Sequence, residues 1–158
     1  MFEITITYFK QFAETFIYSS TLHICMLKIY TYGASRSNPG KASIGIVMFD
    51  EKNKEIFKKK EYIGIASNNV AEYTALLKAL TKAKTMTKGE IECYSDSQLM
   101  VMQINGIYKI NNTNLKDLHD RIKLLLPWFK KVHFRHVKRE NAHIQIADKL
   151  ANMALDEQ

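Results

Sequence analysis

Three acidic residues stand beside apolar segments where carboxylates could carry out chemistry: Glu72, Asp96 and Asp148. Taken singly, each has a structural explanation, since Asp96 could cap a helix and the other two could complement a helix dipole. Carboxylates that crowd together repel one another, so a cluster implies a divalent cation. Mg²⁺ or Mn²⁺ pairs hydrolyse phosphodiesters, one ion activating water and the other stabilising the leaving oxygen. A shared location would therefore indicate metal-dependent phosphodiester hydrolysis.

The expected elements bring these residues to one edge of a sheet. Apolar patterning predicts strands over 27–32, 43–50, 54–65, 91–96 and 130–137, and helices over 70–86, 97–105, 114–127 and 144–156. The order predicts an α/β fold with a five-stranded mixed sheet, three antiparallel strands followed by α/β crossovers, flanked by helices. The first and fourth strands, parallel neighbours, end at Tyr32 and Asp96. Glu72 and Asp148, expected in the first turns of their helices, reach the same edge.

Composition limits the class of protein. The chain has 158 residues, a formal net charge of +7 and two cysteines, Cys25 and Cys93. The positive charge favours nucleic acid as a partner, and two cysteines without metal-type spacing fit a reducing, cytoplasmic location. No apolar run is long enough to cross a bilayer, so we expect no membrane contact. Residues 1–25 carry conflicting strand and helix periods and are expected to form an extension ahead of a domain over 26–158.

Four segments of the chain are far more specific than composition. They read YTYGASRSNPG, ASNNVAEYTALLKAL, YSDSQLMVMQING, and RHVKREN followed by ADKLANMAL. In order and spacing they resemble the signature blocks of type-one ribonuclease H, from about Met26 to Leu155. The resemblance implies the ribonuclease H-like fold, in a compact form without the basic protrusion because 106–114 is short. It also implies a monomer that cleaves the RNA strand of RNA–DNA hybrids with two Mg²⁺ ions, or Mn²⁺ as a substitute, and no small-molecule cofactor.

The resemblance also implies roles for individual residues. Glu72, Asp96 and Asp148 match three of the four metal-binding carboxylates of the family, and His136 matches a loop histidine that assists proton movement and product release. Polar residues implied to contact the hybrid, where the RNA 2′-hydroxyl distinguishes it from DNA, are Asn38, Asn68, Asn69 and Gln98. Basic residues that could contact phosphate are Arg36, Lys138 and Arg139. Outside these segments such residues would be interpreted as turn formers and solvated surface.

The chain departs from the family pattern at Tyr32. The family has Asp there, as the ligand that both metal ions share, whereas a Tyr phenol with a pKa of about 10 stays protonated at pH 7. Tyr32 is therefore expected to weaken metal binding and to cause a severe loss of cleavage. A second departure is the spacing from His136 to Asp148, where 142–146 looks like an insertion that lengthens the loop. His143 is then a possible stand-in for His136.

Three interpretations stay open on the sequence. The chain is an active or recently disabled hybrid-cleaving nuclease, with everything around Tyr32 retained. Alternatively, it is a module that binds nucleic acid without cutting it, for which Tyr32 is the main argument. In the third interpretation the fold is a protein-docking scaffold, with the aromatic residues of 1–25 as the docking patch.

Overall fold

The computed structural model describes residues 24–158. Its elements are β1 (Met26–Ser35), β2 (Gly40–Phe49), β3 (Glu55–Ala66), α2 (Asn68–Ala83), β4 (Glu90–Ser95), α3 (Gln98–Ile104), α4 (Thr113–Leu125), the 3₁₀ turn η1 (Leu126–Trp128), β5 (Lys131–His136) and α5 (Ala142–Asp156). The expected N-terminal extension and its aromatic docking patch lie almost wholly outside the described residues. None of the helices that 24–158 form combines the length and apolar character needed to cross a membrane.

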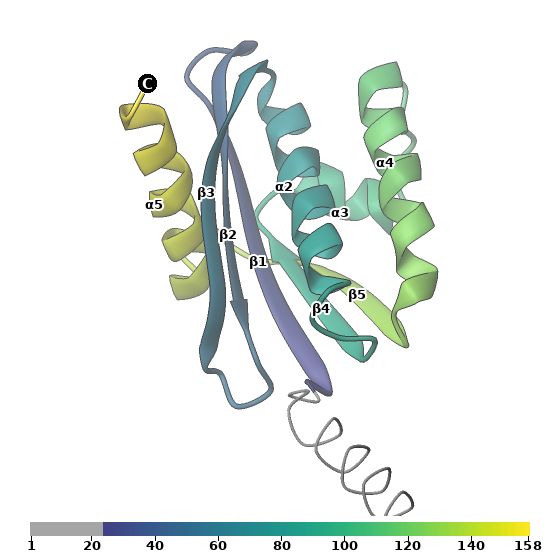
Figure 1. Ribbon diagram of the computed structural model, residues 1–158. Coiled ribbons are helices and arrows are strands. Elements are labelled where there is room, and N and C mark those ends of the chain that lie inside the picture. The colour runs from purple at the N-terminus through teal and green to yellow at the C-terminus, as the bar shows by residue number, and fades with distance from the viewer. Residues whose placement is uncertain (1–23) are drawn as a thin grey trace, which may run out of the picture.

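The five strands form one mixed sheet in the order β3-β2-β1-β4-β5. β1 pairs antiparallel with β2 and parallel with β4, and β4 pairs parallel with β5. Helix α5 covers one face of the sheet, and α2, α3 and α4 lie on the other (Figure 1). The predicted α/β fold with three antiparallel strands and two crossovers is therefore confirmed. The C-terminal ends of β1 and β4 share one edge, as their parallel pairing requires.

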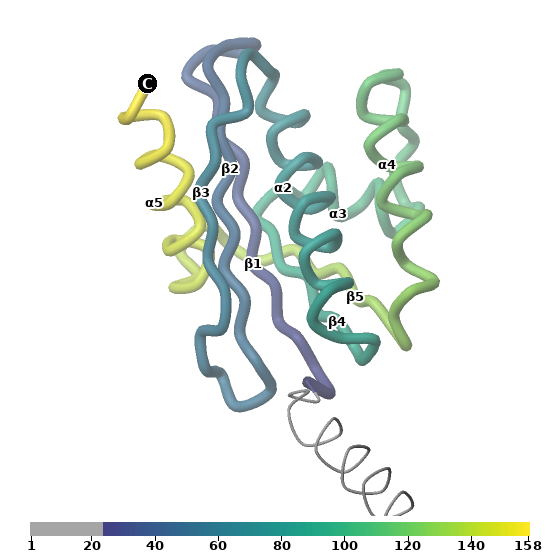
Figure 2. The backbone as a smooth tube through the Cα atoms, viewed as in Figure 1, coloured from purple at the N-terminus to yellow at the C-terminus, as the bar shows by residue number. Residues whose placement is uncertain are grey.

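The core consists of two apolar clusters separated by the sheet. β1 runs through the centre of the backbone trace, between β2 and β4 (Figure 2). Because successive side chains of a strand point to opposite faces, Leu27 and Ile29 join the larger cluster beneath α2. Tyr30 and Tyr32 join the smaller cluster, which α5 completes with Ala147 and other residues. Strand β1 thus contacts helices on both faces and can position residues from both.

Two glycines let those helices approach the sheet. A Cβ at Gly33 would lie 2.3 Å from the backbone nitrogen of Glu72, so α2 packs directly on the end of β1. A Cβ at Gly45 would lie 1.8 Å from the carbonyl oxygen of Ala147, so α5 packs equally closely on β2. Gly45 is the cross-strand partner of Tyr32. Both helices are therefore held close to the edge where β1 ends.

Three predicted helix starts are wrong, each because of a helix cap. Helix α4 is capped by Asn112, whose Oδ1 accepts from the Leu115 N–H at 3.1 Å, and not by Asn114. Helix α2 begins two residues earlier than expected, at Asn68. Helix α5 begins at Ala142 rather than at 144, so the segment 142–146 is helical and does not lengthen the loop. Most of the residues between His136 and Asp148 are therefore helical.

Candidate active site

The structure brings the predicted acidic residues together at the edge where β1 and β4 end. Tyr32 lies near the C-terminal end of β1, and Asp96 directly follows β4. The charges of Asp148, Asp96 and Glu72 all act on the Tyr32 phenol, so the three carboxylates lie in the same neighbourhood as Tyr32. These residues come from four separate segments. Their convergence, which sequence reasoning expected from topology, is therefore present in the fold.

Helix capping does not explain the carboxylates. Ser97 caps α3 by accepting from the Met100 N–H, so Asp96 is not needed for that role. The expectation that Glu72 and Asp148 lie in the first turns of their helices is wrong, because α2 and α5 have no acidic residue there. Ser67 caps α2 and Asn141 caps α5. The common structural explanations for acidic residues at these places are thereby removed.

Glu72 is the most deeply buried of the three carboxyl groups. Its relative exposure is 3%, and no residue of 24–158 donates a hydrogen bond to its Oε2. Burial, followed by the negative charge of Asp96, raises its pKa well above the ordinary value, although the Gly33 backbone N–H donates to the carboxylate. An unpaired buried carboxylate oxygen is costly. Glu72 therefore requires either a proton or a cation.

Asp96 and His136 lie side by side at the ends of β4 and β5. Ser95 and His136 are register partners, so His136 lies beside the residue that precedes Asp96. Asp96 Oδ1 is buried and receives no hydrogen bond from the described residues. Burial raises the pKa of Asp96, while its own backbone N–H and the positive charges of Arg139 and His136 oppose the shift. His136 is exposed and thus accessible to a ligand at this edge.

Arg139 occupies the space between Tyr32 and Asp148. Its Nη2 donates to Asp148 Oδ2 at 3.1 Å, and its guanidinium carbon lies 5.4 Å from the centre of the Tyr32 ring. The Tyr32 side chain is buried, and burial together with the charge of Asp148 raises its pKa to about 12. The phenol is therefore neutral at pH 7. The carboxylate and the aromatic ring both attract the guanidinium, so the two contacts stabilise the position of the Arg139 side chain.

Sequence reasoning missed the contribution of Asn152. Its Nδ2 donates to the Asp148 carbonyl oxygen at 3.0 Å and also to the Asp148 carboxylate. The two residues are four apart on α5, a spacing that puts side chains on the same face of a helix. This four-residue spacing is the feature of the sequence from which the pairing of Asn152 with Asp148 could have been predicted. Asn152 and Arg139 together fix the orientation of the Asp148 side chain.

The site as it stands does not fit a pair of divalent ions. Within residues 24–158, no group of three or more His, Cys, Asp or Glu side chains is placed to hold a metal ion. Tyr32 supplies a neutral phenol where the resemblance implies a shared carboxylate, and Arg139 already pairs with Asp148. One carboxylate oxygen of each of two acidic residues, Glu72 Oε2 and Asp96 Oδ1, has no hydrogen-bond partner among the described residues. The assignment of metal-binding roles to these residues therefore stays a prediction.

The residues expected to contact a hybrid lie on the adjoining surface. Asn38, in the β1–β2 loop, accepts from the backbone N–H of Asn68 at 3.1 Å, which ties that loop to the start of α2. Asn69 and Gln98 are exposed in the first turns of α2 and α3. Arg36 forms an ion pair with Asp156 at the end of α5. These side chains are exposed and thus available to a ligand.

His143 does not face the carboxylates. Its ring lies 4.7 Å from that of Tyr30 and 4.4 Å from that of Phe49, within the aromatic part of the smaller cluster. Its predicted use in place of His136 has no support from this placement. His143 is best described as a packing residue of α5.

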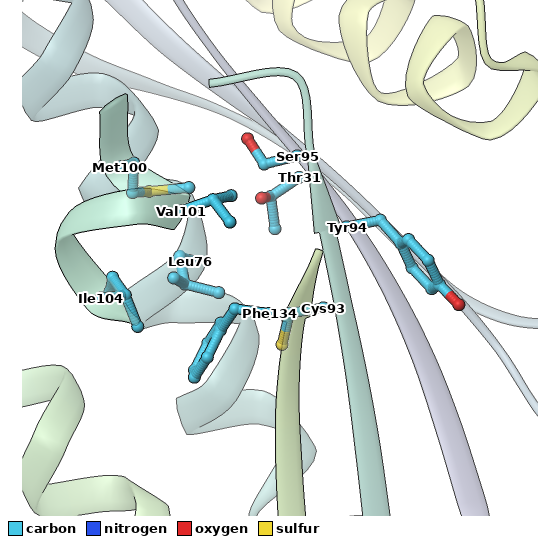
Figure 3. A pocket seen from close by; sticks show the side chains of 9 residues that line it. All are labelled: Thr31, Leu76, Cys93, Tyr94, Ser95, Met100, Val101, Ile104 and Phe134. Carbon is cyan, nitrogen blue, oxygen red and sulfur yellow. The ribbon is translucent and has the colours of Figure 1, made fainter. Parts of the chain in front are cut away.

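A small pocket lies on the other face of the sheet, between the strands and α3. Figure 3 shows the hydroxyls of Thr31 and Ser95 at one side and the side chains of Leu76 and Phe134 at another. The Thr31 Oγ1 is buried and has no hydrogen-bond partner among the described residues. The lining carries no charged side chain. This pocket is therefore distinct in chemistry from the acidic edge.

Comparison with known proteins decides the family. A family model described as reverse transcriptase-like matches residues 31–154. Ribonuclease HI of Halobacterium salinarum is 39% identical over 128 residues, which cover 81% of this chain and 63% of that protein. The chain belongs to the ribonuclease H family. A bifunctional protein of Mycobacterium tuberculosis is a further relative, of which the chain spans 34%.

Solved ribonuclease H structures share the fold. The crystal structure of RNase H1 from Halobacterium salinarum has a TM-score of 0.80 and 37% identity, covering 84% of this chain and 99% of that one. LC11-RNase H1, solved in complex with an RNA/DNA hybrid, has a TM-score of 0.77 and 38% identity, covering 83% and 97%. Ribonuclease H proteins generally depend on divalent metal ions.

Proposed function

We propose that this ribonuclease H protein binds RNA–DNA hybrids at the edge where β1, β4 and β5 end and that it cleaves them poorly. The observation that carries the proposal is the position of Tyr32, whose neutral phenol lies among Glu72, Asp96 and Asp148. Hybrid binding is supported by the family, by a relative solved with a hybrid, and by the net charge of +7. Mg²⁺ remains the expected metal ion of the ancestral site, with Mn²⁺ as its substitute.

The residues divide into two groups in this proposal. Glu72, Asp96 and Asp148 are the remaining carboxylates, and His136 beside Asp96 is placed to exchange protons with a product. The hybrid-binding residues are Asn38, Asn68, Asn69, Gln98 and Arg36. The first group has lost a member at Tyr32, whereas the second group is complete and exposed. The geometry therefore favours binding over cleavage.

The expected loss of cleavage rate can be estimated. A carboxylate shared by two metal ions contributes several kcal/mol to transition-state stabilisation, and each ~1.4 kcal/mol changes the rate tenfold. Tyr32 removes this ligand and one negative charge. We therefore propose a rate at least about a hundredfold below that of a variant carrying the missing carboxylate.

Binding is tested by fluorescence anisotropy with a labelled RNA–DNA hybrid at low salt, in EDTA. Asn69→Ala is expected to weaken hybrid binding, because it removes an exposed amide at the second position of α2. Asn114→Ala is the matched control, since Asn114 is exposed at the second position of α4. DNA duplex of the same length is the competitor. Equal affinity for hybrid and DNA duplex would refute recognition of the RNA strand.

A further inference from the structure

Arg139 is the best-placed cation of the acidic edge. It lies in the segment between β5 and α5, yet its side chain is held from two directions. Asp148 accepts from its Nη2 at 3.1 Å, and the Tyr32 ring faces the guanidinium at 5.4 Å. The partners come from α5 and from β1, which are distant in sequence. The arrangement is therefore part of the tertiary fold.

The charge of Arg139 acts on the whole acidic edge. The guanidinium contacts Asp148 directly. Its positive charge also opposes the upward pKa shifts of Glu72 and Asp96, which it acts on without a direct contact. A divalent ion in the family site would supply the same electrostatic compensation. In this chain one fixed side chain supplies it. A cation that approaches the edge would have to overcome repulsion from Arg139.

Tyr32 and Arg139 form a cation–π contact. An aromatic ring attracts a guanidinium through its negative face, and the phenol adds no charge of its own because its pKa lies at about 12. The ring also fills space at the end of β1, where it is 8% exposed. The substitution that removes a metal ligand thus creates the surface on which a side-chain cation rests.

We propose that Arg139 is the resident cation of this site, standing in for a divalent ion and offering the hybrid a phosphate contact that needs no metal. The Arg139 side chain is 62% exposed, while its Asp148 partner is 20% exposed. A guanidinium has five N–H donors, so the pair with Asp148 leaves donors that can bind phosphate oxygens. The phosphate contact rests on the proposed function, because it requires a hybrid across this edge.

The first test measures metal binding in the absence of nucleic acid. Mn²⁺ is titrated into the full chain by isothermal calorimetry, and Arg139→Ala is expected to bind it at least tenfold more tightly than the unchanged chain. Arg121→Ala is the matched control: Arg121 is 58% exposed and pairs with Asp117 at 3.8 Å on α4. Equal Mn²⁺ affinity in the unchanged chain and Arg139→Ala would overturn the proposal that Arg139 is the resident cation. An equal gain in Arg121→Ala would do the same, since net charge would then explain the result.

The second test measures hybrid binding in EDTA. The unchanged chain is expected to keep its affinity when EDTA replaces Mg²⁺, and Arg139→Ala to lose about tenfold in EDTA, against a smaller loss in Arg121→Ala. Equal losses of hybrid affinity in the two variants would overturn the proposal that Arg139 contacts phosphate. Failure of the unchanged chain to bind hybrid would overturn that contact and the proposed function together. The Mn²⁺ titration would still decide the resident cation by itself.

Discussion

The close approach of α5 to β2 makes Gly45→Ala the most severe small substitution near the site. The added Cβ would lie 1.8 Å from the Ala147 carbonyl oxygen, whereas real Cβ contacts essentially never fall under 3.0 Å. The colliding atom is backbone, so α5 has to move by about 1.2 Å. Forced overpacking of this kind costs about 1–3 kcal/mol. Asp148 follows Ala147 directly, so the same movement displaces its carboxylate from Arg139.

Urea unfolding measures how much Gly45→Ala lowers the free energy of unfolding. With a dependence of about 2 kcal/mol per molar urea, a loss of 2 kcal/mol lowers the midpoint by about 1 M. Gly64→Ala is the control: its Cβ would have open space, but its φ of +85° strains a residue with a side chain, at about 1 kcal/mol. Gly45→Ala should also weaken hybrid binding, and Gly64→Ala should not. Stability and hybrid affinity of Gly45→Ala equal to those of the unchanged chain would refute the packing argument.

Two further predictions concern Glu72 and the cap of α5. Because the raised pKa of Glu72 makes the folded chain hold its proton more tightly than the unfolded chain, stability should fall as pH rises above about 4.3 towards the folded pKa. Glu72→Gln should reduce that fall, measured by urea unfolding at pH 4 and pH 8 beside the exposed control Glu51→Gln; unchanged pH dependence in Glu72→Gln would contradict the assignment. Asn141→Ala removes an acceptor for the N–H groups of His143 and Ile144 and should lower the free energy of unfolding by about 1 kcal/mol. An unfolding midpoint equal to that of the unchanged chain would show that the cap contributes nothing.

The sheet and its acidic edge were predictable from the sequence. Alternating apolar residues such as Leu27 and Ile29 define β1, and one crossover fixes β4 as its parallel neighbour. Once these two strands are adjacent, Tyr32 and Asp96 must lie near one another. The strands follow from local periodicity and a small number of topological rules, which a single sequence contains.

The first residues of the helices and the role of Arg139 were harder to predict from the sequence. Ser67 and Asn141 are ordinary polar residues until their side chains are seen to accept from backbone N–H groups, so α2 and α5 were expected to begin too late. The sequence offered Arg139 as a phosphate contact, but its position over Tyr32 depends on how the segment before α5 folds back across the sheet. Such a contact joins residues more than a hundred positions apart. Local pattern carries no information about it.

Cleavage of a labelled RNA–DNA hybrid in Mg²⁺ and in Mn²⁺, compared between the unchanged chain and Tyr32→Asp, tests the role of Tyr32. We predict cleavage at least about a hundredfold faster in Tyr32→Asp, because the variant regains the carboxylate at the end of β1. Hybrid binding in EDTA, measured on both proteins, controls for folding and for substrate affinity. Equal cleavage rates would contradict the claim that Tyr32 disables the site.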